Sequence, residues 1–148
     1  MKTVDKAWGV ETWLVNEAEY CAKYLNLFKG AYCSMHRHLR KKETFIILEG
    51  EVVLEHGLEG DMTHLKKDEF YTLEPGTWHR FRGVRHSLIL EVSTHHDDED
   101  VERLTESGMG GVLCQRCAGT ECRFSVLAYT TILRRRQQQR CHAQLKAR

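Results

Sequence analysis

GAYCSMHRHLRKKETFIILEG, residues 30–50 of this chain, holds two histidines and a glutamate at close, regular spacing. On a β-strand, residues i and i+2 point to the same face, so His36 and His38 can reach one point together. A second strand after a short turn would bring Glu43 to that point. Two imidazoles and a carboxylate form a ligand set that divalent transition metals accept, and His79 offers a third imidazole. These residues predict a small β-barrel built around one metal ion.

The composition predicts one domain whose charge is divided unevenly along the chain. Of the 148 residues, 41% are hydrophobic, which is enough for one core. Residues 1–111 hold 14 Lys and Arg against 20 Asp and Glu, a balance of −6, whereas residues 112–148 hold 8 against 1, a balance of +7. Because the larger part is acidic, we expect no nucleic acid as the main ligand.

Targeting signals are not recognisable in the sequence. Residues 1–5 lead straight into charged and aromatic sequence without the apolar stretch of a secretory signal. No run approaches the roughly 18 apolar residues of a membrane-spanning helix. We therefore expect a cytoplasmic protein without membrane contact. In a reducing cytosol, Cys21 and Cys33 are expected to be free thiols that pack as small apolar residues.

Short segments rich in β-branched and aromatic residues recur along the first two thirds of the chain, separated by turn residues such as the charged residues 40–42. The expected strands are residues 12–15, 20–28, 31–39, 43–48, 51–55, 62–65, 70–73, 78–81 and 87–93. This rhythm is typical of an antiparallel sandwich or barrel, so the predicted fold class is all-β. Beyond these strands, residues 101–106 suggest one or two helical turns, and residues 108–111 a flexible joint.

The C-terminal part, residues 108–148, differs from the rest. It is basic, holds four of the six cysteines and shows no period of 2 or 3.6 residues. We expect it to be disordered or loosely attached; translation out of frame would also produce such a segment. Cys114 and Cys117 have the spacing of a zinc knuckle, but the later cysteines do not.

The order Gly-x5-His-x-His-x4-Glu-x6-Gly between Gly30 and Gly50 resembles the first motif of the cupin family at every fixed position. The second cupin motif is partly kept. Gly76 and His79 match it, whereas Gly83 stands where an asparagine is usual.

The cupin resemblance implies a double-stranded antiparallel β-barrel of the jelly-roll type over residues 1–107. It also implies that one divalent transition metal, Zn, Mn, Fe, Ni or Co, is bound by His36, His38, Glu43 and His79. Three imidazoles and a carboxylate leave coordination positions open for a substrate. Cupins of this size usually dimerise, so the resemblance implies a homodimer as well.

Three further stretches, residues 8–11, 20–23 and 34–38, resemble the cupin-type mannose-6-phosphate isomerases and related sugar isomerases. This resemblance implies a sugar or sugar phosphate as substrate, and isomerisation or epimerisation through a metal-stabilised enediolate. A base must then move a proton between neighbouring carbons, and Glu91 is the candidate. Lys23, which alternates onto the face expected to point inward, would bind an anionic group or stabilise negative charge.

Two alternatives use the same ligands. An iron-dependent dioxygenase would oxidise a small thiol or acid, and a non-catalytic cupin would bind a sugar without turnover. The remaining histidines of residues 1–111, His95 and His96 included, are not expected to take part in the chemistry.

Overall fold

The structure is a computed structural model that describes residues 1–110. Its strands are β1 Lys2–Lys6, β2 Gly9–Asn16, β3 Cys21–Leu27, β4 Ala31–Tyr32, β5 His36–Arg37, β6 Glu43–Glu49, β7 Glu51–His56, β8 Asp61–Lys66, β9 Phe70–Leu73, β10 His79–Gly83, β11 Ser87–Ser93, β12 Glu102–Arg103 and β13 Gly108–Met109. Residues 1–110 contain no helix, and hence none with the length and apolar character that a membrane crossing needs.

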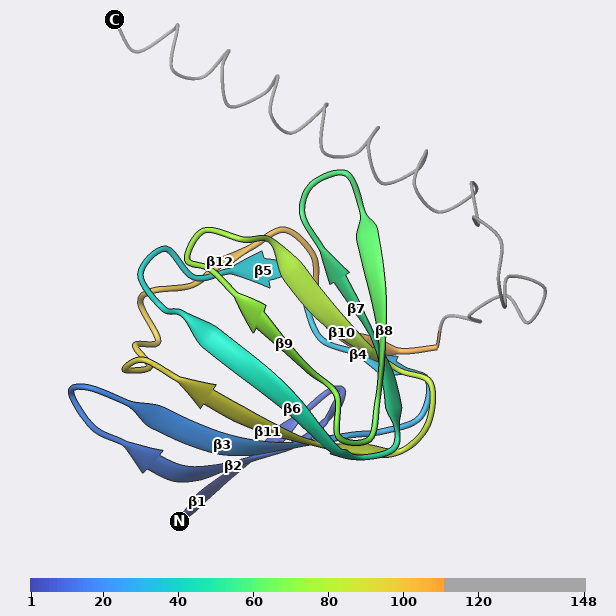
Figure 1. Cartoon of the computed structure of the whole chain (residues 1–148), viewed down its shortest axis with the longest axis horizontal. Coiled ribbons are helices and arrows are strands. Elements are labelled where there is room, and N and C mark those ends of the chain that lie inside the picture. Colours follow the sequence, from blue (N-terminus) through green and yellow to red (C-terminus); the bar gives the residue numbers. More distant parts are fainter. Residues whose placement is uncertain (111–148) are drawn as a thin grey trace, which may run out of the picture.

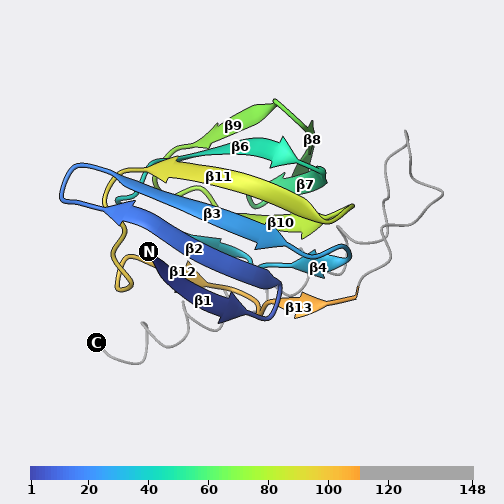
Figure 2. The ribbon, with the colours of Figure 1, turned by 90° about the horizontal axis from the view of Figure 1, so that it is seen from below.

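The strands form two antiparallel sheets that face each other around one interior (Figure 1). The first sheet has the order β1-β2-β3-β11-β6-β9, and these strands lie in one layer in Figure 2. The second has the order β12-β5-β10-β4-β13, and is extended by β7, which pairs with β10, and by β8, which pairs with β7. The structure thus confirms the predicted all-β, double-stranded antiparallel architecture.

The prediction of one continuous strand over residues 31–39 is wrong. β4 ends at Tyr32, and β5 covers only two residues. Between them, Met35 bonds to the segment that follows β12. Its N–H donates to Thr105 Oγ1 (3.0 Å), and its carbonyl oxygen accepts from Leu104 N–H (2.8 Å). Cys33 N–H still donates to Phe81 O of β10 (3.1 Å), so the main chain leaves the ladder with β10 only after Cys33.

The helical turns predicted for residues 101–106 are also wrong, because β12 pairs there with β5. Gly108 and Met109, expected in a flexible joint, form β13 and pair with β4. The sequence pattern does not reveal β1, since Val4 is its single apolar residue. Residues 111–148, with the predicted loose attachment and the zinc-knuckle hypothesis, lie outside the described residues.

The interior is apolar at one end and charged at the other. In β3, β11 and β6, which lie side by side, every second side chain is buried, and the buried side chains of the three strands stand in matching rows. The apolar end includes Leu27, Phe45, Ile47 and Ile89. Toward the other end, the same inward faces carry Lys23, Glu43 and Glu91, all buried. Cys21 and Cys33 are free and buried, as predicted. The alternation therefore gathers buried charges at one end of the barrel.

Gly50, which follows β6, has no room for a side chain. Its φ is +87°, and an added Cβ would lie 2.3 Å from Ser87 Oγ and 2.4 Å from His86 O. We expect Gly50→Ala to lower the free energy of unfolding by about 3 kcal/mol, because backbone strain and a clash act together. Gly30 has a similar φ of +77° but open space around it, so Gly30→Ala should cost only about 1 kcal/mol. Urea unfolding measures both losses, and equal values would contradict the packing role of Gly50.

Candidate functional site

Three histidines and a glutamate meet at the charged end of the interior. His36 lies on β5, directly opposite His79 at the start of β10, while His38 follows β5 and Glu43 begins β6. The ring centroids of His36 and His79 are 4.4 Å apart, those of His36 and His38 5.4 Å, and those of His38 and His79 6.2 Å. The fold thus brings all four predicted metal ligands together.

Main-chain carbonyl groups orient the three imidazole rings. His36 Nδ1 bonds to Ser34 O (2.7 Å), His38 Nδ1 to Asp100 O (2.8 Å) and His79 Nδ1 to Thr77 O (3.0 Å). A carbonyl oxygen only accepts, so Nδ1 of each ring carries the proton and Nε2 keeps a lone pair. This is the arrangement in which metal-binding histidines are held by a second partner.

When the ring of His79 is neutral, its contact with Glu43 joins two electron-pair donors. His79 Nε2 lies 3.0 Å from Glu43 Oε1, yet it is buried and has no partner in hydrogen-bond geometry among the described residues. A cation between these atoms would satisfy both, so the residues fit a divalent transition metal. Within residues 1–110, no group of three or more His, Cys, Asp or Glu side chains is placed so that it could hold a metal ion without movement of side chains. The fit therefore depends on the donor atoms and their protonation.

The protonation of these residues also suits a metal. Burial, with a smaller effect of the neighbouring His79, holds the pKa of His36 well below its usual value, and burial lowers the pKa of His38. Burial by itself would raise the pKa of Glu43, but a protonated His79 in the metal-free site, together with Lys41, more than offsets this and holds it far below its usual range. Neutral imidazoles and an ionised carboxylate are the forms that bind metal ions.

Lys41, which the sequence places in a charged turn, is instead buried beside these ligands. Its Nζ lies 2.7 Å from Glu43 Oε2 and also contacts Glu91 Oε1. Burial would lower the pKa of Lys41, but Glu91 and Glu43 raise it above its usual value. One ammonium group therefore holds two buried carboxylates, one of which belongs to the predicted ligand set.

Asp100 fixes the segment that carries both His38 and Lys41. Its carboxylate accepts hydrogen bonds from the main-chain N–H groups of Leu39 (3.1 Å), Arg40 (3.1 Å) and Lys41 (3.1 Å). Its carbonyl oxygen holds the ring of His38. The position of the candidate site thus depends on a residue about 60 positions further along the chain.

Glu91 and Lys23 both face the interior, opposite each other in the pairing of β11 with β3. Glu91 contacts Lys41 and Ser93 (3.4 Å) through Oε1. Within residues 1–110, these contacts leave Oε2 available to a ligand. Lys23 Nζ lies 3.5 Å from Glu11 Oε1 and 4.1 Å from the ring centroid of Trp13. The roles predicted for Glu91 and Lys23 stay predictions.

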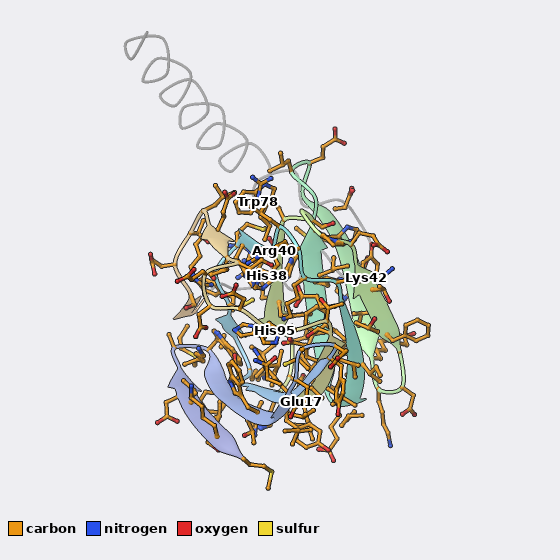
Figure 3. The ribbon with its side chains drawn as sticks, turned by 90° about the vertical axis from the view of Figure 1, so that its left-hand side faces the viewer. Glu17, His38, Arg40, Lys42, Trp78 and His95 are labelled. Carbon is orange, nitrogen blue, oxygen red and sulfur yellow. The ribbon has the colours of Figure 1, made fainter. Side chains whose placement is uncertain are left out.

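A cavity of about 220 Å³ adjoins the predicted ligands. Its wall includes His36, His38, Glu43, Lys23 and Glu91, with apolar side chains at its inner end. His96 also lines it, although the sequence suggested no chemical role for that residue. The adjacent His95 turns instead to Glu17, whose carbonyl oxygen lies 2.8 Å from its Nδ1 (Figure 3).

Sequence reasoning missed Lys41, Asp100 and His96 as site residues. Lys41 could have been found, because it stands two positions before Glu43 and alternates onto the same face. Asp100 and His96 leave no such signal. Their partners lie about 60 and 80 positions away, and no local pattern links them.

Comparisons with known proteins agree with this architecture. The sequence profile of the family described as "Cupin domain" matches residues 24–92. The chain is 35% identical over 113 residues to a D-lyxose/D-mannose isomerase from Thermosediminibacter oceani. That alignment covers 57% of this chain and 61% of the relative, so the chain spans about three fifths of the relative's length.

Solved structures show the same fold at lower sequence identity. The structure of KdgF from Halomonas sp. superposes with a TM-score of 0.60 at 17% identity, covering 67% of this chain and 90% of that one. An RmlC-like cupin from Shewanella frigidimarina gives a TM-score of 0.59 at 17% identity, covering 66% of this chain and 86% of that one. At these identities the likeness concerns the fold alone.

Proposed function

We propose that this chain, which is similar to the cupin family and to a sugar isomerase, isomerises or epimerises a sugar or sugar phosphate with one divalent metal ion. One observation carries the proposal. His36, His38 and the ionised Glu43 line a cavity that Glu91 also lines, and His79 lies beside them with its Nε2 3.0 Å from Glu43 Oε1. Zn, Mn, Fe, Ni and Co all accept such ligands.

His36, His38, Glu43 and His79 would hold the ion. When bound, a divalent ion supplies Lewis-acid chemistry, which polarises the carbonyl and hydroxyl oxygens of an open-chain sugar and acidifies the neighbouring C–H group.

Glu91 acts as the base in this proposal. In isomerisation, Oε2 accepts the proton from the carbon next to the carbonyl group and delivers it to the former carbonyl carbon, while the hydroxyl proton of the first carbon passes to the former carbonyl oxygen. In epimerisation, the proton is returned to the same carbon on its opposite face. Lys41 and Ser93 hold Oε1, so the carboxylate presents Oε2 in a fixed direction. Lys23, across the strand pair from Glu91, stabilises negative charge on the substrate oxygens.

Metal content and sugar conversion test the proposal together. Protein purified without added metal is expected to hold about one transition-metal ion per chain, and His36→Ala less than roughly a tenth of that, since one of four ligands is lost. His95→Ala is the matched control, because His95 lies outside the cavity wall. Equal metal content in wild type and His36→Ala would contradict the metal site.

The conversion assay uses D-lyxose, D-mannose and their phosphates under anaerobic conditions. Conversion that stops on chelation and returns with metal would support the isomerase. Oxygen consumption with iron and a small thiol or acid, without sugar conversion, would favour the dioxygenase. Sugar binding without conversion would favour the non-catalytic cupin.

The homodimer and the cytoplasmic setting suggested by the sequence are part of the same proposal. The molecular mass in solution tests the first, and fractionation of the source cells tests the second.

A further inference from the structure

His96 has a polar ring atom for which the described residues supply no partner. Its Nδ1 is buried and without a hydrogen bond within residues 1–110. Its Nε2 lies 3.2 Å from Asp98 Oδ1. A carboxylate accepts, so Nε2 carries the proton and Nδ1 keeps a lone pair. A buried acceptor left unpaired costs about 1–3 kcal/mol, a cost that a donor group of a ligand in the cavity would remove.

Contacts with β2 hold both the main chain and the ring of His96. Its main-chain N–H donates to Asn16 Oδ1 (2.9 Å), and Asn16 Nδ2 donates to the His96 carbonyl oxygen (3.0 Å). The ring packs edge-on against Trp13 with centroids 4.8 Å apart, and the side chain is only 13% exposed. Such support from a second layer of contacts is what a preorganised binding group requires.

The position of His96 relates it to the rest of the candidate site. It lines the same cavity as Glu91 and Lys23, and its ring centroid lies 6.0 Å from that of His38. Burial, followed by the charges of Lys23 and Lys41, lowers the pKa of His96, which favours the neutral ring. A ligand in this cavity can therefore contact the predicted metal ligands and His96 together.

We propose that Nδ1 of His96 accepts a hydrogen bond from a hydroxyl group of the sugar, which makes His96 a binding and specificity residue. The inference rests on the proposed function, since it requires a polyhydroxylated ligand in the cavity. A lone pair accepts only from a donor, so a hydroxyl group satisfies Nδ1, whereas a carbonyl oxygen or an ionised phosphate oxygen does not.

Binding of D-mannitol to the metal-loaded protein tests this inference, because this open-chain polyol presents hydroxyl groups and cannot be isomerised. We expect His96→Phe, which keeps an aromatic ring against Trp13 but loses the acceptor, to bind about tenfold more weakly by calorimetry. His96→Asn places an amide near the Nδ1 position and should restore binding to within about threefold of wild type. His95→Phe is the matched control and should bind as wild type does.

Deoxy derivatives of D-mannitol identify a direct contact. For one monodeoxy derivative, wild type should bind the derivative about tenfold more weakly than it binds D-mannitol. His96→Phe should bind that derivative and D-mannitol equally, because the variant already lacks the hydrogen bond that the derivative cannot make. Equal binding of D-mannitol by wild type and His96→Phe would overturn the inference. It would also be overturned if each deoxy derivative lost the same affinity in both proteins.

D-mannitol binding that follows the expected pattern, without sugar conversion, would support the role of His96 and reject the isomerase. No binding and no conversion by wild type would reject both.

Discussion

Replacing Glu91 by glutamine is expected to lower kcat for sugar conversion by about 10²–10⁴, the usual contribution of a positioned general base. Glutamine has nearly the same shape, but its amide cannot accept the proton from carbon. The change also leaves Lys41 paired with Glu43, so we expect the fold to persist. Steady-state kinetics on the best of the tested sugars gives kcat and KM, and KM should change much less than kcat.

Two further measurements make the Glu91 test specific. Metal content should stay at the wild-type level in Glu91→Gln, because Glu91 is not in the predicted ligand set. Glu106, also on the cavity wall, provides a matched carboxylate, and Glu106→Gln should keep kcat within about threefold of wild type. A kcat of Glu91→Gln within that same range would remove Glu91 from the mechanism.

Replacing Lys41 by methionine is expected to lower the free energy of unfolding of the metal-free protein by about 3–5 kcal/mol. Methionine matches the unbranched stem of lysine but leaves Glu43 and Glu91 buried without their shared ammonium group. Both carboxyl groups then lack the positive charge that offsets their removal from water. Urea unfolding measures the loss, and an added divalent metal should recover part of it by neutralising Glu43.

Lys42 provides the control for the Lys41 test. Its side chain is 50% exposed and pairs with Glu74 at the surface, so Lys42→Met should change the free energy of unfolding by less than about 1 kcal/mol. A similarly small loss in Lys41→Met would show that Glu43 and Glu91 do not need the ammonium group, and the charge balance inferred for the site would be wrong.

Much of the barrel could be predicted because strand alternation is a local property. The predicted strands at residues 70–73 and 87–93 end where β9 and β11 end. The predicted strand at residues 31–39 failed because a distant residue, Thr105, takes the main-chain hydrogen bond of Met35. A pattern of side chains carries no information about a partner 70 positions away.

The sequence by itself determined the donor set. The two-residue spacing of His36 and His38 and the position of Glu43 at the start of the next long strand place three predicted ligands at one end of the barrel. Only the tertiary structure decided what surrounds them: Asp100 bound to the segment of His38, Lys41 between Glu43 and Glu91, and the orientation of His96. The physical reason is that residues on one strand share a face through the backbone geometry of that strand. Hydrogen bonds and ion pairs between separate loops form only when the closed barrel brings those loops together and removes water from between them.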